Sequence, residues 1–384
     1  MTQIYDTIII GSGPIGNYLA QKLALGGLRV MVLDKKNNLA DAVCCTGIIS
    51  PQCFDKLSLD GNIRYRPYKS ASLFGPQGQN LHFQRHKTVA LVVDRPALNE
   101  LLAARAAAAG VEVVRSTKAV ELHTLNDCID VKAMARGGII HYRGKMAVLA
   151  NGFDPHSPLY PFQQHKSRFT IGIQSLVEVF DCIEPQIYVD REIAPGGFGW
   201  LVPTWGNSGL AGVFCSIKPK QHLECFLQRL KTTGIISSYS ARPASGLIPL
   251  GRPKHTYGER LLVVGEAAGQ VKPTTGGGIY FGLLCADIAA GIIHQAIQGQ
   301  DFSSRLLREY QTRWHKLLKN ELTAGYIMQF VWSRLGNQHL EQILNIMHKQ
   351  NFARTVETCR EFHFDWHSRV MKQQAMRYLL SFKW

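Results

Sequence analysis

The sequence predicts an α/β fold in which two separated segments build one parallel-sheet domain, an antiparallel sheet is inserted between them, and a helical region follows. Three observations predict it. A β-branched run, a glycine-rich loop, a helix and a second strand follow one another over residues 6–33, and a strand, glycines and a long helix return over residues 260–298. Between them, residues 169–214 alternate apolar and polar side chains, with the glycine and proline breaks typical of antiparallel strands. The 384 residues exceed one compact core, so several domains are expected.

The composition is that of a globular protein with a large excess of basic residues. Hydrophobic residues make up 46%, charged residues 18%, and the formal net charge is +15. The basic residues are scattered and no nucleic-acid-binding motif is present, so we expect no nucleic acid partner but an anionic membrane surface or an acidic electron donor. The nine cysteines contain no CxxC pair and no targeting segment precedes the first strand, which indicates a cytoplasmic protein; peripheral contact with the inner face of a membrane is compatible with its charge. The histidines lack metal-ligand spacing, so no metal site is expected.

The first glycine-rich loop follows the strand at residues 6–10 and is typical of a dinucleotide site. Gly11 allows a tight turn, Gly13 lets the backbone approach a pyrophosphate, and Gly16 lets the helix pack closely on the strand. The amino terminus of that helix then presents unpaired N–H groups to the phosphates. Asp34 ends the second strand, where an acid binds the ribose hydroxyls of the adenosine half.

The second glycine-rich segment follows another buried strand, which ends at Gly265. Three glycines, at 276–278, precede a helix predicted over residues 279–298, and they offer close backbone approach and N–H donors where negative charge is bound. Residues 276–293 are apolar enough to raise the question of a membrane span. Asp287 and the glycines favour a buried helix beside the cofactor instead.

These segments, with Arg95 before an alanine-rich helix and a strand ending at residues 147–152, resemble the FAD-binding elements of the glutathione-reductase-like flavoproteins. Glu266 stands where those proteins have aspartate. Only one G-x-G-x-x-G loop is present, so no second domain for stable NADPH binding is expected. The resemblance implies these cofactor-binding residues: Gly11, Gly13, Pro14, Ile15, Gly16, Asp34, Lys35, Cys45, Arg95, Val120, Gly265, Glu266, Pro273, Gly276, Gly277, Gly278 and Ile279.

A tryptophan-containing segment narrows the resemblance. Residues 195–203 resemble the P-x-x-[YF]-x-W-x-[FV]-P signature of the geranylgeranyl reductase family, FAD enzymes that saturate polyprenyl double bonds. The prolines fix the backbone and the aromatic pair gives a rigid apolar wall, although an ordinary strand with a packed tryptophan has the same pattern. The substrate pocket that the resemblance implies contains Pro195, Phe198, Trp200 and Pro203.

A cysteine loop over residues 44–50 resembles the C-x-G-x-x-S loop that runs beside the flavin in that family. Alignment on Gly47 places Cys45 at the family's cysteine, and Cys44 is an addition. A cysteine here acts as a polar neighbour or proton donor, or else as a small buried hydrophobe, and which of the two thiols faces the flavin stays open. The catalytic residues that the resemblance implies are Cys45, Gly47, Phe198 and Trp200.

From residue 302 the chain is predicted to be helical. Tyr310, Trp314, Leu317, Leu318 and Leu322 recur near helical spacing among basic residues. This pattern is typical of a helix that caps a core or of one that lies on a lipid surface, and residues 369–384 show a similar pattern. The expected division is a first part of the FAD-binding domain at 1–165, a β-sheet substrate domain at 166–245, a second FAD-binding part at 246–300, and a helical region at 301–384.

The resemblance implies hydride transfer from reduced FAD to carbon–carbon double bonds of a polyprenyl lipid, with NADPH or reduced ferredoxin as electron donor. Two other functions fit the same motifs. One is an FAD-dependent monooxygenase acting on an aromatic or quinone ring. The other is a non-catalytic protein that binds flavin or lipid, which Glu266 and the doubled cysteine keep open.

Overall fold

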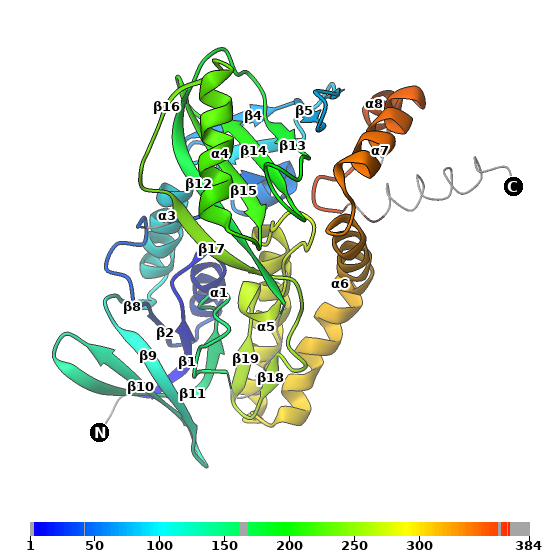
Figure 1. Cartoon of the computed structure of the whole chain (residues 1–384). Helices are drawn as coiled ribbons and strands as arrows, with labels where there is room; N and C mark the ends of the chain where they lie inside the picture. Colours follow the sequence, from blue (N-terminus) through cyan, green and yellow to red (C-terminus); the bar gives the residue numbers. More distant parts are fainter. Residues whose placement is uncertain (1–3, 42, 161–167, 360–361, 367, 369–384) are drawn as a thin grey trace, which may run out of the picture. The chain divides into compact units, whose positions relative to one another are not determined.

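A computed structural model describes residues 4–41, 43–160, 168–359, 362–366 and 368 (Figure 1). The segment 369–384, predicted to be amphipathic, lies outside the described residues. The described residues divide into two compact units, each built from three separated segments. Unit 1 comprises Met1–Asp41, Arg95–Arg168 and Pro249–Leu322, and unit 2 comprises Ala42–Asp94, Phe169–Ile248 and Thr323–Trp384.

Unit 1 contains the predicted parallel sheet. Its strands are β1 (Ile4–Ile10), β2 (Val30–Leu33), β8 (Glu112–Val114), β9 (Lys118–Thr124), β10 (Ile129–Ala135), β11 (Gly138–Leu149), β18 (Tyr257–Gly258) and β19 (Leu261–Val263). They lie in the order β18–β19–β11–β1–β2–β8, and β10 pairs with β11 and β9. β1 is parallel to both β2 and β11, and β11 is parallel to β19. Where these strands pair, residues 8–10, 30–33, 147–149 and 261–263 are apolar and buried, as is typical of the centre of a parallel sheet.

The helices of unit 1 are α1 (Pro14–Leu25), α3 (Arg95–Ala108), the short 3-10 helix η1 (Gly265–Ala268), α5 (Ile279–Gly299) and α6 (Ser304–Trp332), which continues into unit 2 after Leu322. Helix α5 has the length and apolarity of a membrane span, with a mean hydropathy of 1.4, yet 56% of that stretch is buried. It packs against α1, and Tyr18 Oη donates a hydrogen bond to Asp287 Oδ1 at 2.9 Å. Such burial is what the core helix of a folded domain shows.

The apolar stripe of α6 caps the core of unit 1. Tyr310, Trp314, Leu318 and Leu322 are fully buried, and the Trp314 indole donates to Thr256 Oγ1 at 3.0 Å. Leu317 was expected in the same stripe but is 42% exposed. It lies at the edge of the stripe, on the side away from Leu322, so this part of the prediction was wrong.

Unit 2 contains the predicted antiparallel sheet. Its strands are β5 (Ser70–Phe74), β6 (Asn80–Gln84), β12 (Phe169–Val179), β13 (Gln186–Tyr188), β14 (Phe198–Pro203), β15 (Ser208–Cys215), β16 (Ile236–Tyr239) and β17 (Ala244–Pro249). Their order is β16–β12–β15–β14–β13–β5–β6, with β17 beside β12. A three-stranded sheet, β3–β7–β4, is formed by β3 (Ile48–Ile49), β7 (Ala90–Val93) and β4 (Tyr65–Tyr68). The predicted α/β fold class is confirmed.

The domain division differs from the expected one for a topological reason. Residues 42–94 were assigned to the first part of the FAD-binding domain, but they belong to unit 2. Strand β5 pairs in parallel with β13, with Leu73 opposite Ile187, and β6 pairs with β5. This pairing joins segments far apart in the sequence, and it places the cysteine loop in the same unit as the tryptophan segment.

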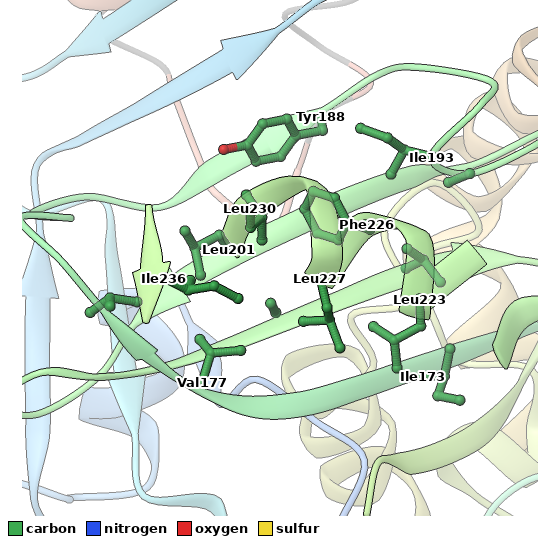
Figure 2. Close-up of a cluster of buried hydrophobic side chains, with 14 of the residues drawn as sticks. Ile173, Val177, Tyr188, Ile193, Leu201, Leu223, Phe226, Leu227, Leu230 and Ile236 are labelled. Carbon is green, nitrogen blue, oxygen red and sulfur yellow. The ribbon is translucent and has the colours of Figure 1, made fainter. Parts of the chain in front are cut away.

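Helix α4 (Pro219–Thr232) covers one face of the large sheet of unit 2 (Figure 2). Its side chains Leu223, Phe226, Leu227 and Leu230 pack on strand residues that include Ile173, Val177 and Leu201. Full burial of each such side chain contributes roughly 1.5–3 kcal/mol, so this cluster strongly stabilises the unit. Pro219 occupies the first turn of α4, where its missing N–H is harmless.

The remaining helices of unit 2 are α2 (Pro51–Lys56), α7 (Asn337–Lys349) and α8 (Phe352–Thr358). Leu344 and Met347 of α7 pack with Leu81 of β6, and Trp332 donates from its indole to the Gly197 carbonyl at 3.2 Å. The half-buried Arg191 donates to the carbonyl oxygens of Trp332, Leu335 and Gly197, so it joins the end of α6 to the turn before β14.

Candidate functional site

The glycine-rich loop of unit 1 has the geometry that the sequence predicts. Gly11 has a φ of +113°, which favours glycine, and an added Cβ there would lie 2.4 Å from the Ala150 carbonyl oxygen. An added Cβ at Gly16 would lie 1.9 Å from the Gly11 carbonyl oxygen, so this glycine allows α1 to pack on β1. At Gly13 nothing lies within 4 Å of such a Cβ. Gly13 therefore faces open space at the amino terminus of α1, where Pro14 and Ile15 follow.

Polar side chains hold this loop in shape. Asn17 and Ser12 exchange two hydrogen bonds, from Asn17 Nδ2 to the Ser12 carbonyl at 2.9 Å and from Ser12 Oγ to Asn17 Oδ1 at 3.0 Å. The Asp34 carboxylate accepts from the Ser12 N–H at 2.7 Å and from the Lys36 N–H at 2.8 Å. Each carboxylate oxygen retains a further lone pair for a ribose hydroxyl. Lys35 is exposed beside Asp34.

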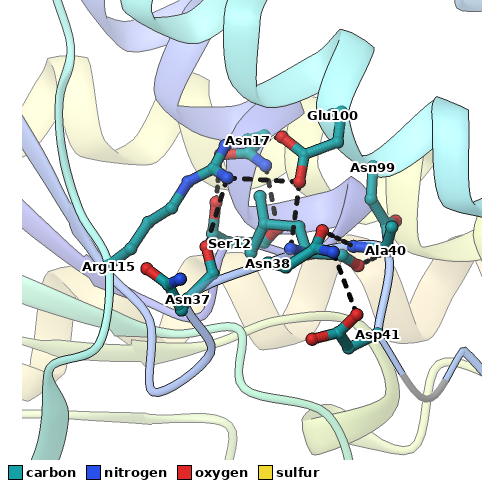
Figure 3. Close-up of polar contacts among 10 residues, drawn as sticks. Ser12, Asn17, Asn37, Asn38, Ala40, Asp41, Asn99, Glu100 and Arg115 are labelled. Atoms are coloured by element: carbon teal, nitrogen blue, oxygen red, sulfur yellow. Dashed lines mark hydrogen bonds and ion pairs between the residues drawn. The ribbon is translucent and has the colours of Figure 1, made fainter.

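The loop after Asp34 is tied to helix α3, as Figure 3 shows. Asn99 donates to the Leu39 carbonyl at 2.8 Å, and Glu100 accepts from the Leu39 N–H at 3.0 Å. Arg115 donates to both carboxylate oxygens of Glu100, at 3.2 and 2.6 Å, and this hydrogen bonding lowers the pKa of the Glu100 carboxyl. These contacts hold the loop that follows Asp34 against α3, the helix that begins at Arg95.

Arg95 and Glu266 are the charged groups of the second half of the predicted cofactor site. Arg95 is buried, donates from Nη1 to Asn99 Oδ1 at 3.0 Å, and leaves Nε without a partner among the described residues. Burial raises the pKa of the Glu266 carboxyl, and the charge of Arg95 opposes this shift. Glu266 Oε2 would lie 4.0 Å from a Cβ at Gly152, which ends the predicted strand segment at 147–152.

The glycines before α5 form a closed turn. The Lys272 N–H donates to the Gly277 carbonyl at 3.0 Å, and the Gly276 N–H donates to the Lys272 carbonyl at 2.9 Å. Gly276 has a φ of +73°, and a Cβ at Gly277 would lie 2.7 Å from Lys272 Cε. Gly278 precedes α5 without a side-chain cap, so the first N–H groups of that helix stay available to an anion.

The other predicted cofactor residues lie at the edges of this arrangement in unit 1. Pro273 is buried in the turn before α5, and Ile279 is the first residue of α5. Gly265 has a φ of +71° at the start of η1, and its N–H donates to Gln270 Oε1 at 2.7 Å. Val120 is an extra residue in β9, because Ala119 and Glu121 pair with the consecutive residues Ala133 and Lys132 of β10. Such a bulge turns a backbone segment away from its partner strand.

The residues of unit 1 fit a flavin dinucleotide. The cradle at Gly11, Gly13 and Gly16, the uncapped amino termini of α1 and α5, and the orphaned Arg95 Nε all favour an anionic ligand with exposed acceptors. Of the predicted cofactor-binding residues, Cys45 alone lies in unit 2.

The aromatic segment of unit 2 lies on β14, on the sheet face opposite α4. Alternation along the strand sends Leu201 into the α4 core and Phe198 and Trp200 to the other side. The rings of Phe198 and Phe214 stack with centroids 5.3 Å apart, and an added Cβ at Gly212 would lie 2.2 Å from Trp200 Cζ2. We call Phe198, Trp200, Gly212, Phe214 and Gln174 the aromatic face, since strand pairing puts them on one side of the sheet.

The two prolines of the signature frame β14. Pro195 lies in the turn before the strand, and Pro203 is its last residue. The Pro203 carbonyl accepts a hydrogen bond from Tyr68 Oη at 2.5 Å, and burial raises the pKa of the Tyr68 phenol. Tyr68, Val92 and Ile48 pack against Trp200, so the small sheet buttresses the tryptophan.

The cysteine loop contacts two strands of the large sheet of unit 2. The Cys44 thiol donates to the Gly172 carbonyl of β12 at 3.3 Å, whereas Ile48 packs with Trp200. Three residues separate Cys44 from Ile48. With consecutive Cα atoms about 3.8 Å apart, they are enough to connect a contact on β12 with a contact on β14. Cys45 Sγ accepts from the Gly47 N–H at 3.5 Å, and Gly47 has a φ of +76°. Cys45, Gly47, Phe198 and Trp200 therefore belong to the same unit.

Three residues of these sites were not predicted from the sequence. Asn17 supports the glycine loop, and its signal was a polar side chain on the buried side of an apolar helix. Gln174 is only 4% exposed and its Oε1 has no partner among the described residues. Gly212 accommodates the Trp200 ring, which no local pattern indicates.

Comparisons with known proteins agree with this geometry. The family model described as FAD binding domain matches residues 4–139. A digeranylgeranylglycerophospholipid reductase of Methanocaldococcus jannaschii is 30% identical over 360 residues, covering 89% of this chain and 90% of the relative. The chain belongs to the geranylgeranyl reductase family. The reductase of the same name from Methanococcus aeolicus is 27% identical over 356 residues, covering 85% of this chain and 86% of that protein.

Solved structures place the family's fold among wider flavoproteins. A geranylgeranyl bacteriochlorophyll reductase-like protein of Thermoplasma acidophilum superposes with a TM-score of 0.83 at 22% identity, covering 91% of this chain and 93% of that one. A p-nitrophenol 4-monooxygenase of Pseudomonas putida reaches a TM-score of 0.71 at 15% identity, covering 94% and 100%. Reductases and oxygenases thus share the fold, and the site decides the chemistry. This geranylgeranyl reductase family member is an FAD-dependent oxidoreductase, as the sequence predicts.

Proposed function

We propose that this protein reduces carbon–carbon double bonds of a geranylgeranyl or related polyprenyl chain carried by a lipid. The observation that supports it most directly is the aromatic face, where Phe198 and Trp200 lie with the cysteine loop in one unit. A polyprenyl chain makes no hydrogen bonds, so rigid aromatic walls with few rotatable bonds bind it well. The relatives named digeranylgeranylglycerophospholipid reductase act, by their names, on lipids of this class.

Reduced FAD, when bound, supplies a hydride to one alkene carbon, and a proton must reach the other carbon. We propose that Cys45, rather than Cys44, donates this proton to the alkene carbon. The Cys44 thiol is engaged with the Gly172 carbonyl, whereas Cys45 accepts a hydrogen bond from Gly47 and donates none to the described residues. The aromatic side chains hold the chain in place and exclude water from the alkene.

The electrons come from NADPH or from reduced ferredoxin, one pair for each double bond. A single dinucleotide loop at Gly11 supports a donor that visits the flavin transiently. The net charge of +15 favours an acidic protein donor and contact with an anionic membrane, where the lipid substrate is dissolved. Peripheral attachment to the inner face of that membrane is the location we propose.

An anaerobic reoxidation experiment tests this function. The purified protein is reduced chemically and mixed with a geranylgeranyl lipid, while flavin absorbance and lipid mass are followed; a fully saturated analogue is the control. We expect reoxidation only with the unsaturated lipid, and a gain of two hydrogen atoms for each bond reduced. Reoxidation that requires oxygen and yields an oxygenated ring would establish a monooxygenase instead. If the bound flavin could not be reduced, the protein would be a non-catalytic flavin- or lipid-binding protein.

A further inference from the structure

The connection from β12 to β13 crosses one end of the large sheet of unit 2. The two strands follow each other in the chain, but β15 and β14 lie between them in the sheet. Residues 180–185 make this crossing, and we call them the crossing segment. Arg66 holds the segment to the β14–β15 turn, because it donates to the Thr204 carbonyl at 2.9 Å and to the Ile183 carbonyl at 3.3 Å.

The crossing segment is anchored at its middle and exposes two large apolar side chains. Cys182 is only 8% exposed and belongs to the core cluster under α4. On either side of this anchor, Phe180 and Ile183 are 73% and 72% exposed. No other large hydrophobic side chain in the described part of the chain is more exposed. Phe180 and Ile183 therefore present apolar groups to the surroundings at the end of the sheet.

A third exposed apolar side chain lies between the crossing segment and the aromatic face. Residues of β12 alternate between the two sheet faces, so Leu176 lies on the same face as Gln174, opposite α4. Leu176 is 55% exposed. The Glu178 carboxylate, farther along the strand, accepts hydrogen bonds from Ser237 and Ser238 of β16. Leu176 is thus the next residue on this face after Gln174 in the direction of the crossing segment.

Exposed basic side chains lie at the same end of the sheet. The guanidinium of Arg64 lies over the ring of Trp205, in the β14–β15 turn, 5.6 Å from its centroid. Lys231 is in the last turn of α4, and the loop after α4 reaches the crossing segment, where the Ile235 carbonyl accepts from the Phe180 N–H at 2.9 Å. Both cations are therefore close in the chain to residues that contact the crossing segment or the neighbouring turn.

The acids of the crossing segment do not neutralise these cations. Arg64, Arg66 and Lys231 form no ion pair with an acid among the residues that the structure describes. Asp181 is exposed, and Glu184 accepts hydrogen bonds from Ser72 and His82 instead. Three cations and two acids leave this end with a positive charge, which favours an anionic partner.

A lipid bilayer fits this end of the sheet better than a protein partner does. Two side chains of this size expose on the order of 300 Å², whereas a stable protein interface buries about 800 Å² on each partner. A bilayer needs no such area, because single apolar side chains enter the boundary between headgroups and acyl chains while cations stay at anionic headgroups. The polyprenyl lipid that we propose as substrate is dissolved in the same bilayer.

We propose that the crossing segment docks on an anionic lipid bilayer, with Phe180 and Ile183 among the upper acyl chains and Arg64 and Lys231 at the headgroups. This inference rests on the proposed function, and it names the surface by which the protein reaches its lipid. Leu176 then lies on the membrane side of the aromatic face, since it lies between that face and the crossing segment.

Sedimentation of the FAD-loaded protein with vesicles tests this surface. The vesicles contain phosphatidylcholine alone or an equal mixture of phosphatidylcholine and phosphatidylglycerol. We expect Phe180→Ser and Ile183→Ser each to weaken binding to the mixed vesicles about tenfold, because each loses one buried apolar side chain. Arg64→Gln should weaken binding about fivefold, and only where phosphatidylglycerol is present.

Ile217→Ser is the matched control. Ile217 is also in unit 2 and is 58% exposed, but it follows the end of β15, where Cys215 pairs with Ile171 near the start of β12. It therefore lies at the opposite end of the same sheet, and its replacement should leave vesicle binding unchanged.

A gain of signal supports the same test without any loss of binding. The emission of Phe180→Trp should shift to shorter wavelength on mixed vesicles and be quenched by lipids with brominated acyl chains. Ile217→Trp should show neither effect. A tryptophan at position 180 that brominated lipids do not quench, in protein bound to the vesicles, would contradict insertion.

Three further results would overturn the inference. Wild-type affinity for mixed vesicles in both serine variants would place the membrane contact elsewhere. A dimer that Phe180→Ser dissociates, with vesicle binding unchanged, would assign the apolar side chains to a second copy of the chain. Wild-type protein that binds neither kind of vesicle would exclude docking.

Reduction of a detergent-dispersed geranylgeranyl lipid separates this inference from the proposed function. Phe180→Ser should reduce the dispersed lipid at the wild-type rate and the same lipid in mixed vesicles more slowly. If the wild type reduced the dispersed lipid but bound no vesicles, the proposed function would stand without the docking surface. If it reduced neither form while Phe180→Trp was quenched, the docking surface would stand and the proposed function would fall.

Discussion

Gly16 of α1 lies against Gly11 so closely that an added Cβ would stand 1.9 Å from the Gly11 carbonyl oxygen. Gly13, between them, has no atom within 4 Å of the same position. Gly16 is thus required by the protein's own packing, whereas Gly13 leaves room for a bound ligand.

The two glycines should therefore respond differently to alanine. Gly16→Ala should destabilise unit 1 with or without FAD, by roughly 1–3 kcal/mol, because backbone must move. Gly13→Ala should leave the apoprotein's urea midpoint unchanged and weaken FAD binding about tenfold or more, because its methyl group enters the phosphate space. Equal loss of apoprotein stability in both variants would contradict this distinction.

Asn17→Leu should open the glycine loop. It leaves the Ser12 carbonyl and hydroxyl without their partner in a buried setting, so the free energy of unfolding should fall by about 1–3 kcal/mol. FAD release should become faster in the same variant, as monitored by flavin fluorescence. Asn62→Leu, a change at an exposed asparagine in unit 2, serves as the control and should alter neither quantity. If Asn17→Leu released FAD at the wild-type rate, the hydrogen bonds between Asn17 and Ser12 would not be needed to hold the cofactor.

His315 of α6 should make acid stability pH-dependent. Burial, with Arg252 and Lys319 nearby, lowers the pKa of this imidazole from 6.5 to about 4. Between these values the unfolded chain binds a proton that the folded chain does not, so the free energy of unfolding falls as the pH is lowered from 6.5 to about 4. His315→Gln should flatten this part of the curve in urea titrations.

The exposed His339 of α7 provides the comparison for that titration. His339→Gln should keep the wild-type slope over the same pH range. An unchanged slope in His315→Gln would mean that other groups cause the acid loss.

The two adjacent cysteines should be separable by serine. In Cys44→Ser the hydroxyl can still donate to the Gly172 carbonyl, so reoxidation of the reduced flavin by a polyprenyl lipid should stay near the wild-type rate. Cys45→Ser replaces the proposed proton donor by a much weaker acid and should slow that step by about 10²–10⁴-fold, with FAD affinity retained. If Cys44→Ser slowed this step and Cys45→Ser did not, the proton donor would be Cys44.

Features of the site that arise from short segments were predictable from the sequence. Gly11, Gly13, Gly16 and Asp34 occupy their expected places because a strand, a tight turn and a helix constrain one another within a few residues. The same is true of β14, where alternation alone sends Phe198 and Trp200 to one face.

Long-range pairing was not predictable in this way. Nothing local in Leu73 indicates that it will lie opposite Ile187, and this pairing is what moves residues 42–94 into unit 2. The meeting of Gln174 with Trp200 at Gly212 depends on the register of two strand pairs at once. Alternation along β12 favours Gln174 on the face away from the α4 core, but it does not determine which residues of β15 and β14 lie opposite, because a shift of two residues keeps the face and changes the partners.

The long sequence separation between β11 and its partner β19 has a consequence for folding during synthesis. Strand β11 ends at Leu149, but its parallel neighbour begins only at Leu261, after the strands of the other sheet have been synthesised. On the ribosome, the apolar edge of β11 stays uncovered throughout that interval, and bare strand edges template aggregation. A chaperone that shields nascent chains, or slow translation after Leu261, should therefore raise the yield of soluble protein more than either would for a chain whose sheet closes in sequence order.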